Sequence, residues 1–222
     1  MPNTGADTRR TRDVEHLFEH LDSTPGLGQR VNSARRSTTG RVPATTLRRM
    51  SAPTPAGEPL QDHPSVARVR RVLADLGATG QVVVLDDHVR TAALAAAALG
   101  VQVGQIANSL IFSVPDAAAP EDRRPLLVLT SGAHKVDVDQ VAAVLGVERL
   151  DRADADFVRR RTGFAIGGVA PVGHTSPVQT LVDVELAQYD VVWAAGGHPR
   201  TVFPTRYDEL LRITAGQPVE VD

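Results

Sequence analysis

The sequence contains no cysteine, few aromatic residues and no large excess of charge of either sign. The absence of cysteine excludes disulfide bridges, thiolate nucleophiles and cysteine-ligated zinc. Aromatic residues make up 4% of the 222 residues and hydrophobic residues 42%, so the core must consist chiefly of valine, leucine, alanine and isoleucine. The formal net charge of −2 provides no overall field that would attract nucleic acid or a membrane.

Long apolar segments are missing as well. No run is long enough to span a bilayer, and the arginines near the N-terminus are not followed by the apolar stretch of a secretory signal. Together with the lack of cysteine, these absences fit a soluble cytoplasmic protein with no membrane partner. Nothing in the composition specifies an oligomeric state.

Several motifs of known enzyme classes are also absent. The chain has no GxSxG elbow, no Walker loop and no GxGxxG fingerprint. Its histidines lack HExxH or any other paired-ligand spacing, so we expect no metal site and no cofactor. The adjacent acids Asp86 and Asp87 suit acid–base chemistry, but acids at such a position more often cap the next helix.

Residues 1–62 differ in composition from the rest of the chain. The segment is rich in arginine, threonine, serine, proline and glycine, and it has only one short apolar pattern, at 14–21. Such a composition cannot bury enough apolar surface to offset the entropy lost on ordering, so we expect a disordered N-terminal extension. Met50 is an alternative start of the chain. The arginines of this segment also leave open a generic RNA-binding protein that acts through a basic arm.

From residue 63 to 222 the pattern becomes regular and predicts one domain. Helical spacing is found at 63–77, in an alanine-rich stretch that ends at Gly100, and at 136–146, 154–163 and 206–216. Strands are expected at 81–87, 105–114, 125–132, 178–186, 190–197 and 201–203. Helices and strands alternate without a strict βαβ order. We therefore predict a mixed α/β fold, with a mixed, largely antiparallel sheet and surrounding helices.

The segment from Gly167 to Pro171 is the most informative candidate site. Gly167 and Gly168 permit backbone conformations denied to other residues, and Pro171 makes the exit of the turn rigid. Successive free amides in such a turn form a concavity suited to an anion or a polarised carbonyl. Gly-Gly turns are also common as plain connections, and spacing alone does not separate the two interpretations.

Two further segments hold candidate binding residues. Gly196 and Gly197 end an apolar strand beside His198, and small residues at a strand end leave room for a ligand. Loop histidines are more often surface residues than ligands. Asn108 and Ser109 interrupt an otherwise apolar strand, and a buried asparagine needs hydrogen-bond partners from the fold or from a substrate.

The order of these segments resembles the YbaK and prolyl-tRNA-synthetase-associated (ProX-type) aminoacyl-tRNA editing family, from about His63 to Gly216. The strongest match is TGFAIGGVAPVGH at 162–174, which contains the family's GxxxP element as Gly167 to Pro171. The resemblance implies a pocket for the aminoacyl ester at the tRNA 3′ end, with the GxxxP amides holding the substrate carbonyl or terminal ribose. It also implies that a ribose hydroxyl of the tRNA, rather than a side chain, helps to activate water, and that no metal is needed.

The same resemblance assigns roles to residues of this chain. It places Gly167, Gly168 and Pro171 in the catalytic turn, and the substrate-binding residues are Asn108, Ser109, Gly196, Gly197 and His198. One departure is that many members have a lysine, thought to contact the tRNA acceptor end, where this chain has Asn108. Asparagine carries no charge and cannot replace an ammonium group at a phosphate. Lys135 is a possible substitute that nothing in the sequence places nearby.

These observations predict a trans-acting aminoacyl-tRNA deacylase that hydrolyses the ester of mischarged tRNA. Its partners would be the tRNA acceptor end and, by resemblance, prolyl-tRNA synthetase. The alternative is a non-catalytic module that keeps the fold, has lost the family lysine and binds a small ligand or a protein.

Overall fold

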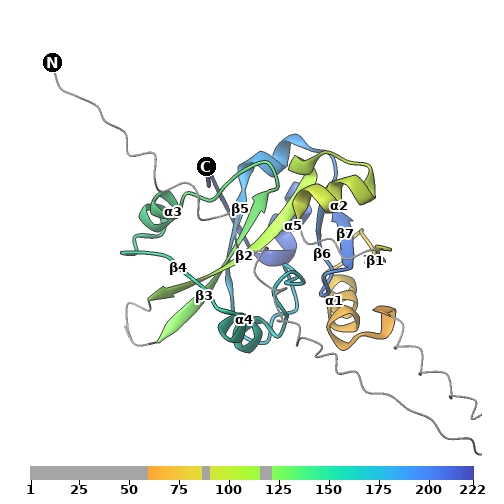
Figure 1. Ribbon diagram of the computed structural model, residues 1–222, viewed down its shortest axis with the longest axis horizontal. Helices are drawn as coiled ribbons and strands as arrows, with labels where there is room; N and C mark the ends of the chain where they lie inside the picture. Colours follow the sequence, from red (N-terminus) through yellow and green to blue (C-terminus); the bar gives the residue numbers. More distant parts are fainter. Residues whose placement is uncertain (1–59, 87–90, 116–121) are drawn as a thin grey trace, which may run out of the picture. The chain divides into compact units, whose positions relative to one another are not determined.

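The computed structural model describes residues 60–86, 91–115 and 122–222 (Figure 1). These residues all belong to one unit of the chain. The predicted N-terminal extension lies outside the described residues, except for Leu60–Asp62, which form the short 3-10 helix η2. Met50 and the arginines of the basic arm also lie outside them.

Five helices lie close to their predicted positions among the described residues. They are α1 (Pro64–Asp75), α2 (Ala92–Leu99), α3 (Val138–Leu145), α4 (Ala155–Thr162) and α5 (Tyr207–Thr214). Capping residues fix their ends, because a side-chain oxygen of Thr91, Asp137 or Asp154 accepts the first free amides of α2, α3 and α4. Each of these three helices stops at a glycine with positive φ. None of the helices in the described ranges has the length and apolar character needed to cross a membrane.

Eight strands form one sheet within the described part of the chain, and the prediction of a mixed sheet is confirmed. They are β1 (Val83–Val84), β2 (Ile106–Pro115), β3 (Arg123–Ser131), β4 (Asp151–Arg152), β5 (Gln179–Asp183), β6 (Val192–Ala195), β7 (Thr201–Thr205) and β8 (Gln217–Val219). Their order is β1-β7-β6-β2-β3-β5-β8, and β4 pairs with β2. The long β2–β3 pair is antiparallel, as are β1–β7, β6–β7 and β2–β4, whereas the pairs β2–β6, β3–β5 and β5–β8 are parallel.

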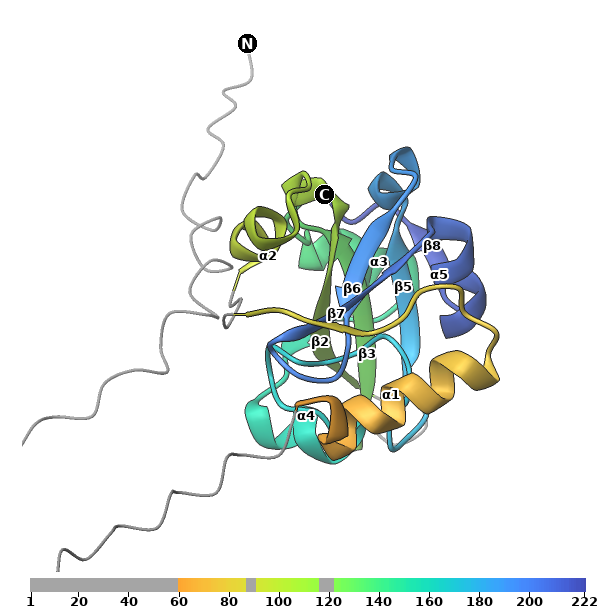
Figure 2. The same cartoon turned by 90° about the vertical axis from the view of Figure 1, so that its right-hand side faces the viewer.

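Helices cover both faces of this sheet. In Figure 2, α2 lies on one side of the strands and α5 on the other. One face packs against α1, α4 and α5 in the largest core cluster, which contains Ala107, Leu127, Leu129, Val182 and Ala194 of the strands. The other face packs against α3 through Phe112, Val128 and Leu181, and against α2 through Ile106. We call these the α1 face and the α2 face of the sheet.

One edge of β2 changes partner along its length. At its start, Ile106 and Ala107 pair in parallel with β6, and further on Phe112 and Ser113 pair with β4. Strand β3 occupies the opposite edge throughout. Residues 108–111 therefore have no strand on this edge among the described residues. We call this interruption the notch.

Some sequence predictions are wrong at the level of single elements. The strand expected at 178–186 ends at Asp183, because the Asp183 carboxylate caps a 3-10 helix, η4 (Val184–Gln188), by accepting from the Glu185 amide. The strand expected at 81–87 is reduced to Val83–Val84. Strands β4 and β8, and the 3-10 helix η3 (Val103–Gln105), were not predicted, because two or three residues are too few for a periodic signal.

Candidate functional site

The two glycine-containing turns singled out in the sequence lie against each other. A methyl group at Gly168 would be 2.9 Å from Cα of His198 and 3.0 Å from Cδ of Pro199, which is closer than packed atoms allow. Gly167 also faces Pro199, at 3.8 Å from the same construction. Glycine at 168 is therefore required for the two backbones to meet. The sequence identified both turns but not their contact.

The second turn also packs closely on helix α1. Gly197 has φ of 100°, and a methyl group there would lie 2.9 Å from the carbonyl oxygen of Ser65 and 3.0 Å from Val69. The turn is closed by Thr201, whose Oγ1 accepts the His198 amide at 3.0 Å and whose amide donates to the His198 carbonyl at 2.9 Å. The His198 backbone is thus fixed between α1 and the GxxxP turn.

The exposure of the GxxxP turn changes sharply along its length. Gly167 is exposed, with φ of 83°, whereas Val169 is 4% exposed and Ala170 is fully buried. The amide of Gly168 donates to Ala165 within the turn, at 3.0 Å. Within the described ranges, the amides of Gly167, Val169 and Ala170 donate to no acceptor. The expected row of open amides is therefore reached from solvent mainly at Gly167.

Arg68 holds the segment before the GxxxP turn against α1. Its guanidinium lies over the Phe164 ring, 4.5 Å from the centroid, and one of its amino groups donates to the Gly163 carbonyl at 3.1 Å. Burial, and then repulsion by Arg71, lower the pKa of Arg68 below its usual value. Its Nε is buried and has no partner in the described part of the chain. This contact was not predicted from the sequence, because a helical pattern does not show which of its arginines is buried.

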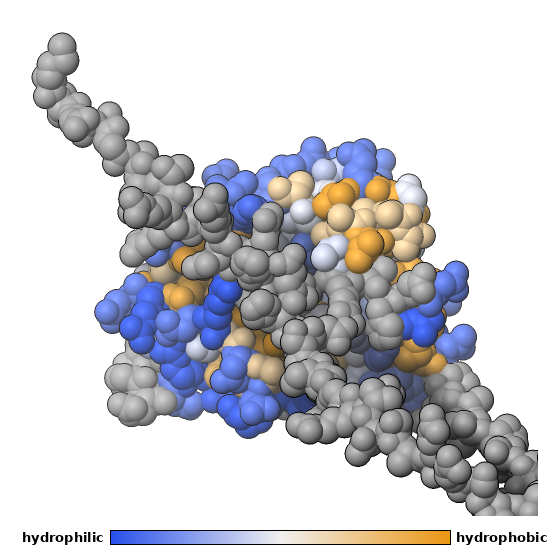
Figure 3. Space-filling model, viewed as in Figure 1, coloured by the Kyte–Doolittle hydropathy of each residue, from blue (hydrophilic) through white to orange (hydrophobic). Residues whose placement is uncertain are grey.

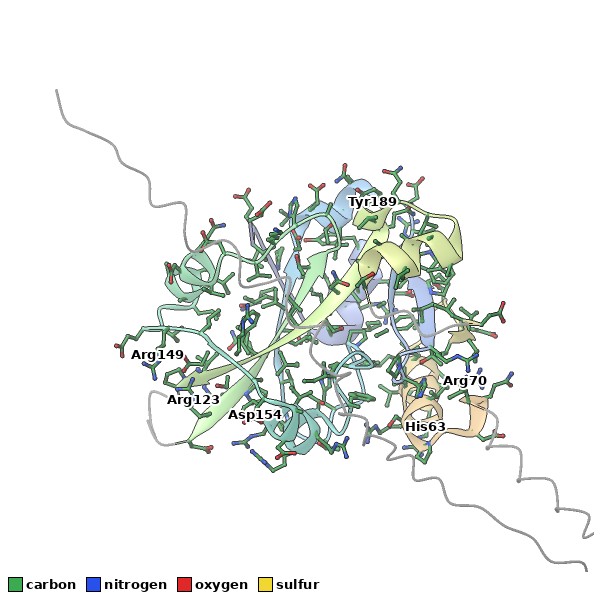
Figure 4. All side chains as sticks on the ribbon, viewed as in Figure 1. His63, Arg70, Arg123, Arg149, Asp154 and Tyr189 are labelled. Carbon is green, nitrogen blue, oxygen red and sulfur yellow. The ribbon has the colours of Figure 1, made fainter. Side chains whose placement is uncertain are left out.

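Two imidazole rings meet beside the turn. The rings of His63 and His198 are 5.2 Å apart and tilted by 59°. Nδ1 of His63 accepts the Ser65 amide at 3.3 Å and caps α1, whereas Nδ1 of His198 accepts the Arg200 amide at 3.1 Å. A ring nitrogen that accepts a hydrogen bond carries no proton, so these contacts leave the proton of each neutral ring on Nε2. His63 marks the start of α1 in Figure 4.

His174 supports the buried half of the GxxxP turn. Its Nε2 is 2.8 Å from the carbonyl oxygen of Ala170, and its ring packs edge-on against Phe164. Burial lowers the pKa of His174; the Ala170 hydrogen bond opposes this shift, and the charge of Arg68 adds to it. The neutral ring is therefore the form that suits this position.

Asn108 and Ser109 lie at the notch, but their side chains belong to opposite faces of the sheet. Ala107 and Ile111 pack in the same core cluster as Val169 and Ala170, and strand alternation puts Ser109 on that α1 face. Asn108 lies on the α2 face, between Ile106 and Leu110. The Oγ of Ser109 is buried and has no hydrogen-bond partner among the described residues. The structure thus brings Ser109, rather than the Asn108 side chain, to the face of the GxxxP turn.

A second polar cluster lies on the α2 face, next to Asn108. Thr130, which faces Asn108 in the β2–β3 register, donates to the Asp183 carboxylate at 3.2 Å. Asp183 is fully buried, accepts the Ser131 amide at 2.9 Å and lies 3.0 Å from Nδ1 of His134. The next residue, Lys135, is exposed after β3. These contacts satisfy a buried carboxylate and explain the cluster as part of the fold.

The two glycine-containing turns do not lie at the pocket beside Tyr189 or at a cluster of metal-binding residues within the described part of the chain. No group of three or more histidine or acidic residues in the described ranges is arranged to hold a metal ion. A pocket of about 320 Å³ lies at the start of β6 and the end of β7, lined by Ala187, Tyr189, Asp190, Arg206, Tyr207 and Asp208. The turns lie at the other end of these two strands, so we place the candidate site at the notch.

Known proteins share both the sequence pattern and the fold. Residues 86–213 match the family model described as aminoacyl-tRNA editing domain. The chain is similar to the solved structure of a candidate trans-editing enzyme for prolyl-tRNA synthetase, with 39% sequence identity and a TM-score of 0.65, over 72% of this chain and 97% of that one.

Two curated proteins are also similar. A candidate Cys-tRNA(Pro)/Cys-tRNA(Cys) deacylase, EbsC of Enterococcus faecalis, is 22% identical over 136 residues, which are 61% of this chain and 79% of that protein. The proline–tRNA ligase of Limosilactobacillus fermentum is 32% identical over 92 residues, or 41% of this chain and 16% of the ligase.

Proposed function

Because the chain belongs to the aminoacyl-tRNA editing domain family, we propose that it is a trans-acting deacylase, which hydrolyses the ester between a wrong amino acid and the 3′ end of a tRNA. The observation that carries this proposal is the contact of the GxxxP turn with the His198 turn, beside the notch in the sheet. Only a turn with glycine at 168 fits there, and its accessible amide at Gly167 is available to a ligand.

The proposed chemistry relies on backbone donors rather than on a protein nucleophile. In ester hydrolysis, the oxygen of water attacks the carbonyl carbon, the carbonyl oxygen becomes negative, and the ribose oxygen leaves with a proton. The amide of Gly167, the exposed residue of the turn, would stabilise the developing oxyanion, an effect on the order of a hundred-fold in rate. Ser109 has no base within hydrogen-bonding distance among the described residues, so it lacks the activation that a serine nucleophile needs.

The remaining site residues would bind the substrate. Ser109, with an unpaired hydroxyl on the α1 face, would hydrogen-bond the ester or the ribose. The turn of Gly196, Gly197 and His198 would form one wall of the amino-acid pocket: the two glycines are buried against Val82 and α1, and the His198 ring would limit the size of the pocket. Asn108 would contact the acceptor end from the α2 face. The proposed partners are mischarged tRNA and, in the cytoplasm, prolyl-tRNA synthetase.

A panel of mischarged tRNAs tests the proposal directly. The full chain is incubated with tRNA(Pro) carrying alanine, serine or cysteine, and with correctly charged Pro-tRNA(Pro), and loss of the ester is followed with time. We expect faster hydrolysis of at least one mischarged substrate than of Pro-tRNA(Pro). Absence of turnover on every substrate at high enzyme concentration would refute the deacylase and favour a binding module with this fold.

A further inference from the structure

Three exposed arginines on two neighbouring helices have no acidic partner. They are Arg71 of α1 and Arg159 and Arg160 of α4, and none of them makes an ion pair within the described residues. Other exposed arginines are neutralised by nearby acids: Arg149 pairs with Asp151, and Arg206 with Asp208. We call Arg71, Arg159 and Arg160 the arginine face.

Direct contacts hold the two helices of the arginine face together. Arg68, one turn before Arg71, donates to the carbonyl of Gly163, the residue that ends α4. Thr175 contacts the same region, because its hydroxyl lies 3.3 Å from the carbonyl oxygen of Arg160. Helices α1 and α4 also lie at the same end of the sheet in Figures 1 and 2.

The arginine face flanks the candidate site on two sides. Helix α1 begins after His63, whose ring contacts His198, and Arg71 lies about 12 Å further along at 1.5 Å per residue. Helix α4 ends only a few residues before Gly167. In the space-filling view, hydrophilic residues are visible at the position of α4 (Figure 3). A polyanion whose end lies at the GxxxP turn would therefore pass next to both helices.

Local structure alone does not account for these charges. Arginines in the last turn of α4 are favoured by the helix dipole, which explains Arg159 and Arg160 in part. Arg71 is not in the last turn of α1, and its charge acts against that of the partly buried Arg68. Asp75 and Asp156 lie one helical turn from Arg71 and Arg160, but no ion pair joins them within the described residues, so the three guanidinium groups stay open to an anionic partner.

We propose that the arginine face binds phosphates of the tRNA acceptor stem while the 3′ ester lies at the GxxxP turn. The inference rests on the proposed function and adds the route of the duplex over α1 and α4. Three guanidinium groups provide the positive charge that Asn108 does not supply. The notch then holds the ester, and the two helices hold the stem.

The test compares two double variants that remove equal charge. R71Q/R160Q takes one arginine from each helix of the arginine face, and R149Q/R206Q is the control, with side chains of comparable exposure elsewhere. Binding of uncharged tRNA is measured over a range of salt concentrations. Each lost phosphate contact lowers the slope of log K against log salt by about 0.7–0.9, so we expect a drop of roughly 1.5 for R71Q/R160Q. The control should keep the wild-type slope, and R71K/R160K should restore most of the affinity.

Substrate length separates the stem contact from the chemistry. For deacylation of a charged acceptor-stem minihelix, R71Q/R160Q should raise KM roughly tenfold with little change in kcat. Hydrolysis of 3′-aminoacyl-adenosine, which has no stem phosphates, should be unaffected. An equal loss of tRNA affinity in both double variants would overturn the proposed role of the arginine face. A loss of activity of R71Q/R160Q on aminoacyl-adenosine would overturn it as well.

The binding measurement also distinguishes this inference from the proposed function. The protein could show no deacylation while R71Q/R160Q still lowers the salt slope of tRNA binding. That result would support the arginine face and refute the proposed deacylase activity. If deacylation is normal and the slope is unchanged, the deacylase stands and the arginine face is wrong.

Discussion

Gly168 lies directly on the backbone of His198, with no room for a side chain between them. A methyl group at 168 would be 2.9 Å from Cα of His198 and 3.0 Å from its carbonyl carbon. Both atoms belong to the main chain, so neither can move aside without moving the turn. This contact fixes the position of the GxxxP turn relative to the proposed amino-acid pocket.

Replacing the glycines of the turn should reduce activity by two different mechanisms. Gly168→Ala should displace the turn and abolish most deacylation. Gly167→Ala meets no atom closer than 3.8 Å but forces alanine to a φ of 83°, which costs about 1–2 kcal/mol. Gly146→Ala is the matched control, because it has φ of 64° in open space at the end of α3. Thermal unfolding should show similar losses of stability for Gly167→Ala and Gly146→Ala. The rate of deacylation should fall at least tenfold only for Gly167→Ala.

Alanine at 108 and at 109 should separate the two faces of β2. Ser109 Oγ is buried and unpaired on the face of the turn, whereas the Asn108 side chain belongs to the α2 face. We expect Ser109→Ala to lower kcat/KM about tenfold, the loss of one hydrogen bond to substrate. Asn108→Ala should lower kcat/KM by a smaller factor than Ser109→Ala when aminoacyl-adenosine is the substrate. A larger effect at 108 than at 109 would place the ester on the other face.

Arg68→Met should make the GxxxP turn less rigidly held, although residue 68 does not contact the substrate. The substitution keeps an apolar stem but removes the contact with the Phe164 ring and the hydrogen bond to Gly163, together about 1–2 kcal/mol. We expect a lower free energy of unfolding and a reduced kcat. Arg68→Lys keeps the charge and should recover only part of both, because lysine lacks the planar group. Recovery to the wild-type level would show that charge alone matters here.

The folded state should lose stability below neutral pH through His174. Burial lowers the pKa of His174 in the folded state, so the unfolded chain binds the proton more readily. The resulting loss in the free energy of unfolding is absent well above pH 6.5. It grows as the pH falls from about 6.5 to the lowered folded-state pKa of His174, and it is constant below that pKa. His174→Gln keeps a hydrogen-bond donor for the Ala170 carbonyl but cannot titrate. Urea unfolding from pH 8 to pH 5 should show a smaller loss for the variant than for the wild type.

Local signals in the sequence predicted the helices well. The predicted stops at Gly100, Gly146 and Gly163 each end a helix, and Asp137 and Asp154 cap the starts of two of them, because caps are decided by residues within one turn. The mixed sheet also followed from the order of the elements. Strands β4 and β8 were missed, since their pairing depends on distant partners and not on their own few residues.

The candidate site shows where sequence reasoning stops. The strand and its polar residues Asn108 and Ser109 were predicted, but the pattern did not tell which of the two side chains would lie on the face of the glycine turns. That depends on the pairing of Ala107 with Ala194, two segments that local periodicity does not connect. The contacts of Arg68 and His63 depend on the same tertiary arrangement.

Asn108→Lys tests whether the uncharged residue at the notch limits tRNA binding. A lysine there adds a positive charge at a half-buried position, and its flexible stem can bring the ammonium to solvent. If acceptor-end phosphates pass the notch, tRNA affinity should rise a few-fold and the salt slope should steepen by about 0.7–0.9. Val144→Lys is the control, since Val144 is 60% exposed on α3 and gains the same charge. An equal gain in both variants would mean that the added charge acts non-specifically, and no gain at 108 would mean that the acceptor-end phosphates do not pass the notch.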